Sequence, residues 1–185
     1  VATRLAVHFT RSDENRQGQP DTEAFENVQI RVSDGSVIFA PGLFAEDVQI
    51  EDARYRMASV DAGVKYRGFA LEGEYYWRWV DQFQTRGSGA LPFDELDDDG
   101  FQIQASAMLL PKMLQVYAGA SKVFGQYGDP SDSRVGFNLY PWKNTVFRLN
   151  GEYLHLNRSP VGALSLPHPV GGDGSVFHAN VMVYF

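Results

Sequence analysis

Apolar and polar residues alternate along much of the chain, and the alternation is clearest in residues 60–80, VDAGVKYRGFALEGEYYWRWV. Two alternating arms meet there at a short turn, residues 67–68. Because successive side chains of a strand point to opposite faces, one face of this hairpin is apolar and the other is charged. The apolar face ends in Tyr75, Trp77 and Trp79. Each arm has about ten residues, the length that a tilted strand needs to cross a bilayer.

The same pattern predicts eight strands, joined by long and short connections in strict alternation. The strands cover residues 1–10, 58–66, 69–80, 101–109, 114–124, 134–140, 147–154 and 177–185. The long connections are about 11–56, 81–100, 125–133 and 157–174, and the short turns are 67–68, 110–113 and 141–144. Within the first long connection, Ser33-Asp34-Gly35 predicts a further hairpin between residues 28–32 and 36–39, because Asp-Gly tolerates the positive φ of tight turns.

This organisation predicts an all-β fold, an antiparallel up-and-down transmembrane β-barrel with eight strands in this chain. Such barrels have short turns on the periplasmic side and long loops on the outer side. The aromatic residues fall in the two bands expected at the membrane interfaces, which are Tyr66, Phe69, Trp142, Phe147 and Phe185 near the short turns, and Phe9, Tyr75, Trp77, Trp79, Phe101 and Phe124 near the long loops. A soluble β-sandwich or lipocalin-like barrel is the alternative with the same alternation.

Composition narrows the classes of function. The formal net charge of −7 argues against a nucleic-acid partner, which is held by contacts to phosphate. The chain has no cysteine, so it has neither a disulfide framework nor a thiolate metal site. It also has no apolar run of the 18 or more residues that a transmembrane helix needs.

Three segments, VDAGVKYRGFALEGEYYWRW (60–79), PKMLQVYAGASKVFGQYGDP (111–130) and LNRSPVGALSLPHPVGGDGSVFHANVMVYF (156–185), together resemble the C-terminal region of the phosphate-selective porin O/P family. The resemblance covers nearly the entire chain. It implies that residues 1–185 form a single unit, the C-terminal half of a sixteen-stranded porin barrel that assembles as a homotrimer. It also implies passive diffusion of small hydrophilic solutes or ions, with anions such as phosphate among them.

A closed eight-stranded barrel is the main alternative to the half-barrel. Side chains fill the interior of a barrel of that size, so it would serve as a membrane anchor or a surface-interaction protein. A chain that begins on a strand, without a lead-in segment, favours the half-barrel.

Nine ionisable residues on the charged faces are the candidates for lining a pore, where they could steer ions. They are Arg4, Asp61, Lys65, Glu72, Glu74, Arg78, Arg134, Arg148 and Glu152. With five basic and four acidic members, this wall is nearly neutral. Mutual salt bridges that stiffen the sheet are an equally good explanation of these residues.

Other chemistry is weakly indicated. The acidic run of residues 94–99 is expected in an outer loop, where it could bind Ca²⁺ or Mg²⁺, but its spacing does not match an EF-hand loop. Among the histidines, His8 and His178 are expected on the charged face, and His155 on the apolar face or rim. None of them gives Ser159 or Ser165 a defined base. We therefore expect no enzymatic activity, no cofactor and no metal site.

The last strand resembles the C-terminal strands of other barrel proteins, which carry the pattern that the outer-membrane assembly machinery reads. Phe177, Val181, Val183 and Phe185 place hydrophobic residues at every second position before a C-terminal aromatic. The predicted location is the bacterial outer membrane. The predicted partners are outer-membrane lipid, lipopolysaccharide and the barrel-assembly machinery.

Overall fold

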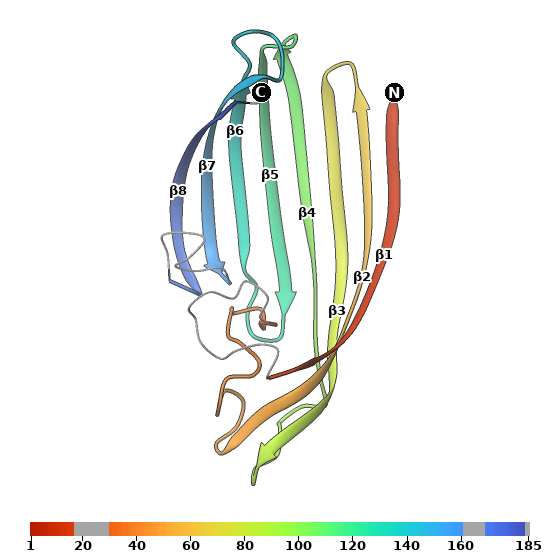
Figure 1. The fold of residues 1–185 in the computed structure, drawn as a ribbon, viewed down its shortest axis with the longest axis vertical. Helices are drawn as coiled ribbons and strands as arrows, with labels where there is room; N and C mark the ends of the chain where they lie inside the picture. The colour runs from red at the N-terminus through yellow and green to blue at the C-terminus, as the bar shows by residue number, and fades with distance from the viewer. Residues whose placement is uncertain (17–29, 161–168, 184–185) are drawn as a thin grey trace.

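The fold, seen in a computed structural model that describes residues 1–16, 30–160 and 169–183, is a single antiparallel sheet (Figure 1). Its eight strands are β1 (Ala2–Asn15), β2 (Val48–Tyr66), β3 (Phe69–Gly87), β4 (Glu95–Leu110), β5 (Leu114–Gly125), β6 (Ser131–Leu139), β7 (Phe147–Ser159) and β8 (Gly172–Val183). Each strand pairs with the next one in sequence, in the order β1 to β8. The predicted all-β, antiparallel, up-and-down fold is confirmed. The described residues contain no helix that is long and apolar enough to cross a membrane.

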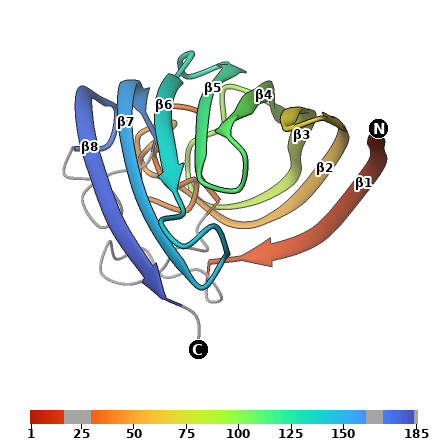
Figure 2. The ribbon, with the colours of Figure 1, turned by 90° about the horizontal axis from the view of Figure 1, so that it is seen from above.

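The sheet is strongly curved but does not close (Figure 2). Within the described residues, β1 pairs only with β2 and β8 only with β7, so one edge of each is unpaired. The β2–β3, β4–β5 and β6–β7 connections lie at one end of the sheet, and the other four lie at the opposite end. Their lengths do not alternate strictly as predicted, because the β6–β7 connection (140–146) is longer than the β5–β6 connection (126–130). These two ends are called the short-turn end and the long-loop end below.

The two faces of the sheet differ sharply in polarity. On the convex face the apolar side chains are exposed, and Leu5, Val7 and Phe9 of β1 keep 74%, 72% and 69% of their surface accessible. On the concave face the alternate positions are polar or charged, and Ser59 and Asp61 are buried there. This arrangement is the reverse of a soluble β-barrel, which keeps its apolar side inside.

The register sets side chains from distant parts of the chain side by side on the concave face. Arg4 lies opposite Gly63, which lies opposite Glu72, and the same row continues through Gln104, Gly119 and Arg134. Strand neighbours in such a row are about 4.8 Å apart. Irregularities in the ladder occur near the strand ends, between Ile50 and Arg54, at Met108/Leu110 and at Leu156/Ser159.

The strands run further into the long connections than the alternation predicted. The connections predicted at 11–56 and 81–100 shrink to 16–47 and 88–94, and those at 125–133 and 157–174 shrink to 126–130 and 160–171. The acidic run predicted in an outer loop lies almost entirely on β4, with only Asp94 outside the strand. The alternation missed these extensions because their convex face is ionic, while their apolar residues, Ile50, Ala53, Val80 and Leu96, lie on the concave face instead.

Cross-strand ion pairs stabilise these extensions. Arg54 Nε lies 3.0 Å from Asp13 Oδ1, and Arg56 pairs with Asp81 and, at 3.2 Å, with Glu95. Opposite charges on neighbouring strands each add a few tenths of a kcal/mol to about 1 kcal/mol. These pairs therefore account for strand structure in a region that reads as a polar loop.

Residues 30–47, called the inner segment below, fold back inside the curve of the sheet (Figure 2, orange). A tight turn forms as predicted at Ser33-Asp34-Gly35, where the Val32 amide donates to the Ser36 carbonyl oxygen at 2.9 Å. Residues 28–29 of the predicted hairpin lie outside the described residues, and Arg31 and Val37 form its single described bridge. Gly35 has a φ of +92°, which a side chain rarely allows.

A small hydrophobic core forms where the inner segment meets the concave face. Its buried members are Val32, Ile38 and Phe39 of the inner segment and Ile50, Ala53, Val80 and Leu96 of the strands. Rings of Phe44, Phe83 and Phe93 pack edge to face around it. The interior of the curve is therefore filled by apolar side chains at the long-loop end and lined by polar side chains elsewhere.

Candidate functional site

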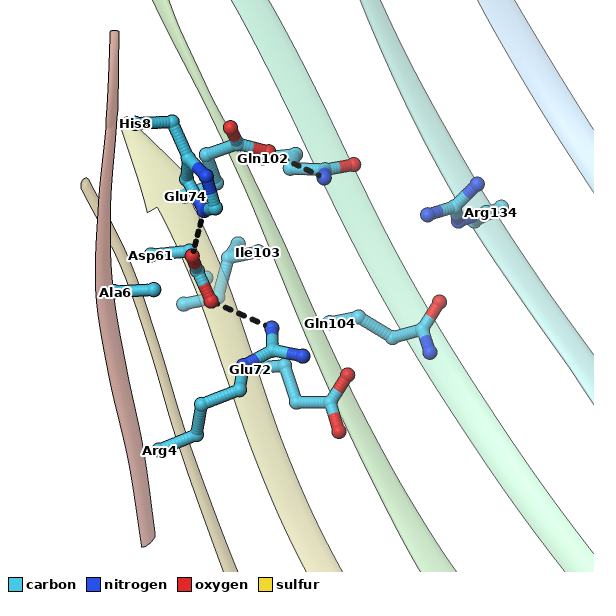
Figure 3. Close-up of a pocket in the computed structure, with 11 residues that line it drawn as sticks. Arg4, Ala6, His8, Asp61, Glu72, Glu74, Gln102, Ile103, Gln104 and Arg134 are labelled. Carbon is cyan, nitrogen blue, oxygen red and sulfur yellow. Dashed lines mark hydrogen bonds and ion pairs between the residues drawn. The ribbon is translucent and has the colours of Figure 1, made fainter. Parts of the chain in front are cut away.

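The concave face between the inner segment and the short-turn end forms a polar surface, called the concave wall below. One hollow in it has a volume of about 390 Å³, room for about a dozen water molecules at about 30 Å³ each. Five of the predicted pore-lining residues line this hollow together, namely Arg4, Asp61, Glu72, Glu74 and Arg134 (Figure 3). Lys65 lies in the adjacent hollow toward the short turns, beside Glu72.

Asp61 is the centre of a three-residue charge cluster on β1 and β2. Arg4 Nη2 lies 2.7 Å from Asp61 Oδ1, and His8 Nε2 lies 2.8 Å from Asp61 Oδ2. The Asp61 side chain is 11% exposed, whereas Arg4 and His8 are more than half exposed. Because a nearly buried carboxylate needs compensation, this pairing holds both basic side chains against the wall.

The two glutamates of β3 are held differently. Glu72 pairs with Lys65 at 3.2 Å, an exposed ion pair of the kind that contributes at most about 1 kcal/mol. Glu74 accepts a hydrogen bond of 3.2 Å from the Gln102 side-chain amide and has no cationic partner among the described residues.

Two arginines on the other half of the wall have no carboxylate partner in the described part of the chain. Arg134 of β6 lies across β5, where a Cβ on Gly119 would meet its Nε at 3.0 Å, and this Nε has no hydrogen-bond partner. Arg148 of β7 donates to the sulfur of Met182 on β8. The concave wall is thus charge-compensated on β1 and β2 and carries unpaired cations on β6 and β7.

A hydrogen-bonded network occupies the wall between these arginines. Tyr117 donates to Glu152 at 2.9 Å and accepts a hydrogen bond of 2.9 Å from Asn150. Its ring lies so close to Gly136 that a Cβ there would meet the ring at 2.5 Å. The absence of a side chain at Gly136 is therefore what lets the tyrosine reach across β6.

Side-chain amides continue the network along a row at the short-turn side. Asn180 donates to Asn150 at 3.2 Å, and Asn138 donates to Gln115 at 3.1 Å. Sequence reasoning named only ionisable residues and missed these amides, together with Tyr117, Gln102 and Gln104. They stand at the polar positions of the same alternation, which is the signal that could have found them.

Arg78, the remaining candidate, lies apart from the hollow, under the inner segment. It pairs with Asp98 of β4, whose side chain is 7% exposed. Arg78 and Asp98 line a small cavity together with Val32 and Ser33 of the inner segment and with Tyr127. Asp98 was missed as a wall residue because the acidic run was predicted to be a loop. The arginine and aspartate form a structural pair beneath the inner segment.

The inner segment is fixed to the wall by close backbone contacts as well as by its core. The Tyr127 amide donates to Ser33 Oγ at 3.2 Å. Gly125 packs so tightly on Ser33 that no side chain fits at that position. The Gln49 side-chain amide donates to the Phe39 carbonyl oxygen at 3.1 Å. These contacts hold residues 30–47 in one place across the concave face.

Three ionisable groups near the long-loop end have shifted pKa values. Burial raises the pKa of Tyr55, which packs against the hydrophobic core of the inner segment. Burial also raises the pKa of Tyr127. Hydrogen bonds from Ser88 lower the pKa of Asp47.

The described residues offer little catalytic or metal-binding geometry. They contain no group of three or more His, Cys, Asp or Glu side chains that could hold a metal ion. His155 lies on the convex face with its Nδ1 3.1 Å from Ser175 Oγ, and Ser175 Oγ also lies 2.8 Å from the Tyr153 hydroxyl. Residues 161–168, with Ser165 and His168, lie outside the described residues.

The described residues of the predicted assembly signal lie on one face of β8. Phe177, Val181 and Val183 of β8 all lie on the convex side and are exposed, whereas Phe185 lies outside the described residues.

In comparisons with known proteins, no family model, no curated protein and no solved structure matches the chain.

Proposed function

We infer that the chain is part of an outer-membrane porin that allows passive diffusion of small hydrophilic solutes or ions. The observation that carries this proposal is the inverted polarity of the sheet. The same strands expose Leu5, Val7 and Phe9 on the convex face and bury Asp61 on the concave face. Lipid is the environment that an exposed apolar face of this kind requires, and water is the environment that a charged concave wall requires.

The height of the apolar face agrees with a bilayer. Aromatic residues bound it on β3, from Phe69 at the short-turn end to Trp79 at the other end. The ten residue steps between them cover about 34 Å along the strand, which a tilt of about 45° reduces to about 25 Å, the height of the apolar band of outer-membrane barrels. Just beyond Trp79, the convex face becomes ionic at Arg56, Asp81 and Glu95.

The unpaired edges of β1 and β8 favour a barrel larger than eight strands. Unpaired backbone groups cannot remain in lipid, so these edges need partner strands. We propose that further strands complete a sixteen-stranded barrel, of which residues 1–185 form one half, and that three such barrels assemble as a trimer. The charged, hollowed wall also favours a water-filled interior over the side-chain-filled interior of a closed eight-stranded anchor.

Solute preference follows from the wall. Ion pairs cancel most of the charge on β1 and β2, so the wall favours general hydrophilic passage more than passage of one sign of ion. The unpaired Arg134 and Arg148 are the residues that would favour anions such as phosphate, as the resemblance implies. The inner segment would narrow the passage at the long-loop end.

The location and partners belong to the same proposal. In the bacterial outer membrane the convex face would contact lipid, and the ionic rim at the long-loop end would contact lipopolysaccharide. The exposed Phe177, Val181 and Val183 would be available to the barrel-assembly machinery during insertion. The proposal involves no catalysis, cofactor or nucleic acid.

Conductance of the full-length protein in a planar lipid bilayer tests the proposal. A water-filled barrel gives steady ohmic steps that scale with salt concentration. A protein that inserts, as shown by protection of the convex strands from protease, and yet gives no steady conductance would be a membrane anchor. A protein that stays monodisperse in water without detergent would overturn the membrane fold as well.

A further inference from the structure

We propose that the hollow of the concave wall takes zwitterionic solutes, with a cationic group at Glu74 and an anionic group at Arg134. The inference rests on the proposed passage of hydrophilic solutes and names a class of solute for it. Its basis is that these two residues are the charges of the hollow that have no oppositely charged partner in the described structure (Figure 3).

The other charges that line the hollow are already compensated. Asp61 is shared by Arg4 and His8 at 2.7 and 2.8 Å. Glu72 pairs with Lys65 at 3.2 Å. A solute that competed for any of these groups would first have to break an existing ion pair, so the hollow presents them to a solute as nearly neutral.

Glu74 and Arg134 are each positioned by a neutral neighbour. Gln102 donates to one carboxylate oxygen of Glu74 at 3.2 Å, and no hydrogen bond in the described structure occupies the other oxygen. Arg134 lies over Gly119, and its Nε has no partner. Gln104 lies between Glu72 and Arg134 (Figure 3), where its amide can donate to and accept from the middle of a solute.

Two carboxylates near Arg134 each accept a hydrogen bond from a hydroxyl group. Asp132, two residues before Arg134 on β6, accepts a hydrogen bond from Ser121. Glu152 accepts one from Tyr117 at 2.9 Å. Neither carboxylate forms an ion pair with the Arg134 guanidinium, which leaves this arginine able to bind the carboxylate of a solute.

The separation of the two groups selects the size of the solute. Glu74 lies on β3 and Arg134 on β6, three strand spacings apart, which is about 14 Å between backbones along the sheet. Glu74 reaches toward Gln102 of β4 and Arg134 lies over Gly119 of β5, so the gap between the charged groups is shorter than the gap between the backbones. An extended peptide advances about 3.4 Å per residue, so the termini of a di- or tripeptide fit the remaining gap better than those of a single amino acid.

A solute with both charges gains at both ends, whereas a simple ion gains at one and is repelled at the other. Each contact lies in a partly exposed site and is worth roughly a two- to fivefold change in occupancy. The preference should weaken in about 1 M salt, where the screening length falls to about 3 Å.

Swelling of proteoliposomes tests the inference with the full-length protein. The probe is triglycine, and the reference solute is its uncharged N-acetyl amide. We expect the ratio of the two initial swelling rates to fall about two- to fivefold in Glu74→Gln and in Arg134→Gln, and further in the double variant. The matched control is the double variant Asp13→Asn/Arg54→Gln, which also removes one charge of each sign, but from an ion pair that lies outside the hollow, and it should leave the ratio unchanged.

The outcomes separate the two proposals. If neither solute causes swelling, although the protein inserts, the proposed passage is wrong. If both solutes enter and the ratio is the same in the wild type and all variants, the passage stands and the zwitterion site is wrong. If the control lowers the ratio as much as the test variants do, the effect does not arise in the hollow, and the assignment to Glu74 and Arg134 fails. Unchanged circular dichroism of each variant establishes that it has folded.

Discussion

Replacing Phe39 by alanine should release the inner segment while leaving the sheet intact. Phe39 is 0% exposed and lies at the centre of the dry core between the inner segment and the concave face. Truncation of a fully buried phenylalanine costs about 3–5 kcal/mol, because the apolar contacts are lost and a cavity is left behind. The rest of this small core comes from a few aliphatic and aromatic side chains, so a loss of this size is a large share of what holds residues 30–47 in place.

The sheet does not depend on that core in the same way. Its strands are held by continuous backbone ladders from β1 to β8, and most of them lie beyond the reach of Phe39. The expected result is therefore local opening of the inner segment rather than global unfolding. Under the proposed function, an opened inner segment widens the passage at the long-loop end and raises single-channel conductance.

Hydrogen exchange of the reconstituted protein measures the first effect, and planar-bilayer recording measures the second. Amides of residues 30–47 should exchange at least a hundredfold faster in Phe39→Ala, since about 3 kcal/mol corresponds to a factor of that order. Leu43→Ala is the control, because Leu43 belongs to the same segment but is 37% exposed. Unchanged exchange in Phe39→Ala would refute the claim that this core fixes the segment. Faster exchange without a change in conductance would refute the claim that the segment narrows the passage.

Three further predictions concern stability. Gly136→Ala should destabilise the protein by about 1–3 kcal/mol in chemical denaturation, because the new methyl group would meet the facing tyrosine ring at 2.5 Å. Gly73→Ala, whose nearest contact would be 3.4 Å, is the control and should cost little. Arg78→Met should cost about 3–5 kcal/mol of stability, because it leaves the nearly buried Asp98 uncompensated. Adding Asp98→Leu should restore most of the loss. Full additivity of the two changes would refute an ion pair between these residues. Burial raises the pKa of Tyr55, so packing of the inner segment should be stable below the ordinary tyrosine pKa of about 10 and weaken as pH rises through the raised value. Hydrogen exchange of residues 30–47 measures this change. Exchange that accelerates with pH equally in Tyr55→Phe would contradict this cause.

The sequence was informative wherever one face of a strand is apolar. Alternation in residues 60–80 identified a hairpin, its turn and the face of each side chain, because a shift of one residue would exchange the two faces. It failed at Glu95–Asp99, where the apolar Leu96 faces inward, the residues on either side of it are acidic, and cross-strand contacts hold the ladder. Such contacts depend on register between distant segments, which no local pattern records.

The inner segment was predictable only in part, for a different reason. The turn at Ser33-Asp34-Gly35 follows from local backbone preferences and was found. The position of Ile38 and Phe39 inside the curve was not, because two apolar residues in a polar connection indicate burial without indicating against what. Their partners in the core, Val80 and Leu96, lie more than 40 residues away in the sequence.

The partition of charge on the concave wall follows from the same long-range register. Each ionisable residue stands at a polar position of the alternation, so its face could be predicted, but its partner could not. Lys65 and Glu72 pair because the turn of the first hairpin brings β2 and β3 together at that level. Glu74 and Arg134 stay unpaired because three strand spacings separate them and because the residues directly opposite Glu74 are Asp61 and Gln102, neither of which is a cation. A nearly neutral list of charges therefore includes a hollow with one unpaired charge of each sign, and a solute that carries both charges is the one that such a hollow distinguishes from a simple ion.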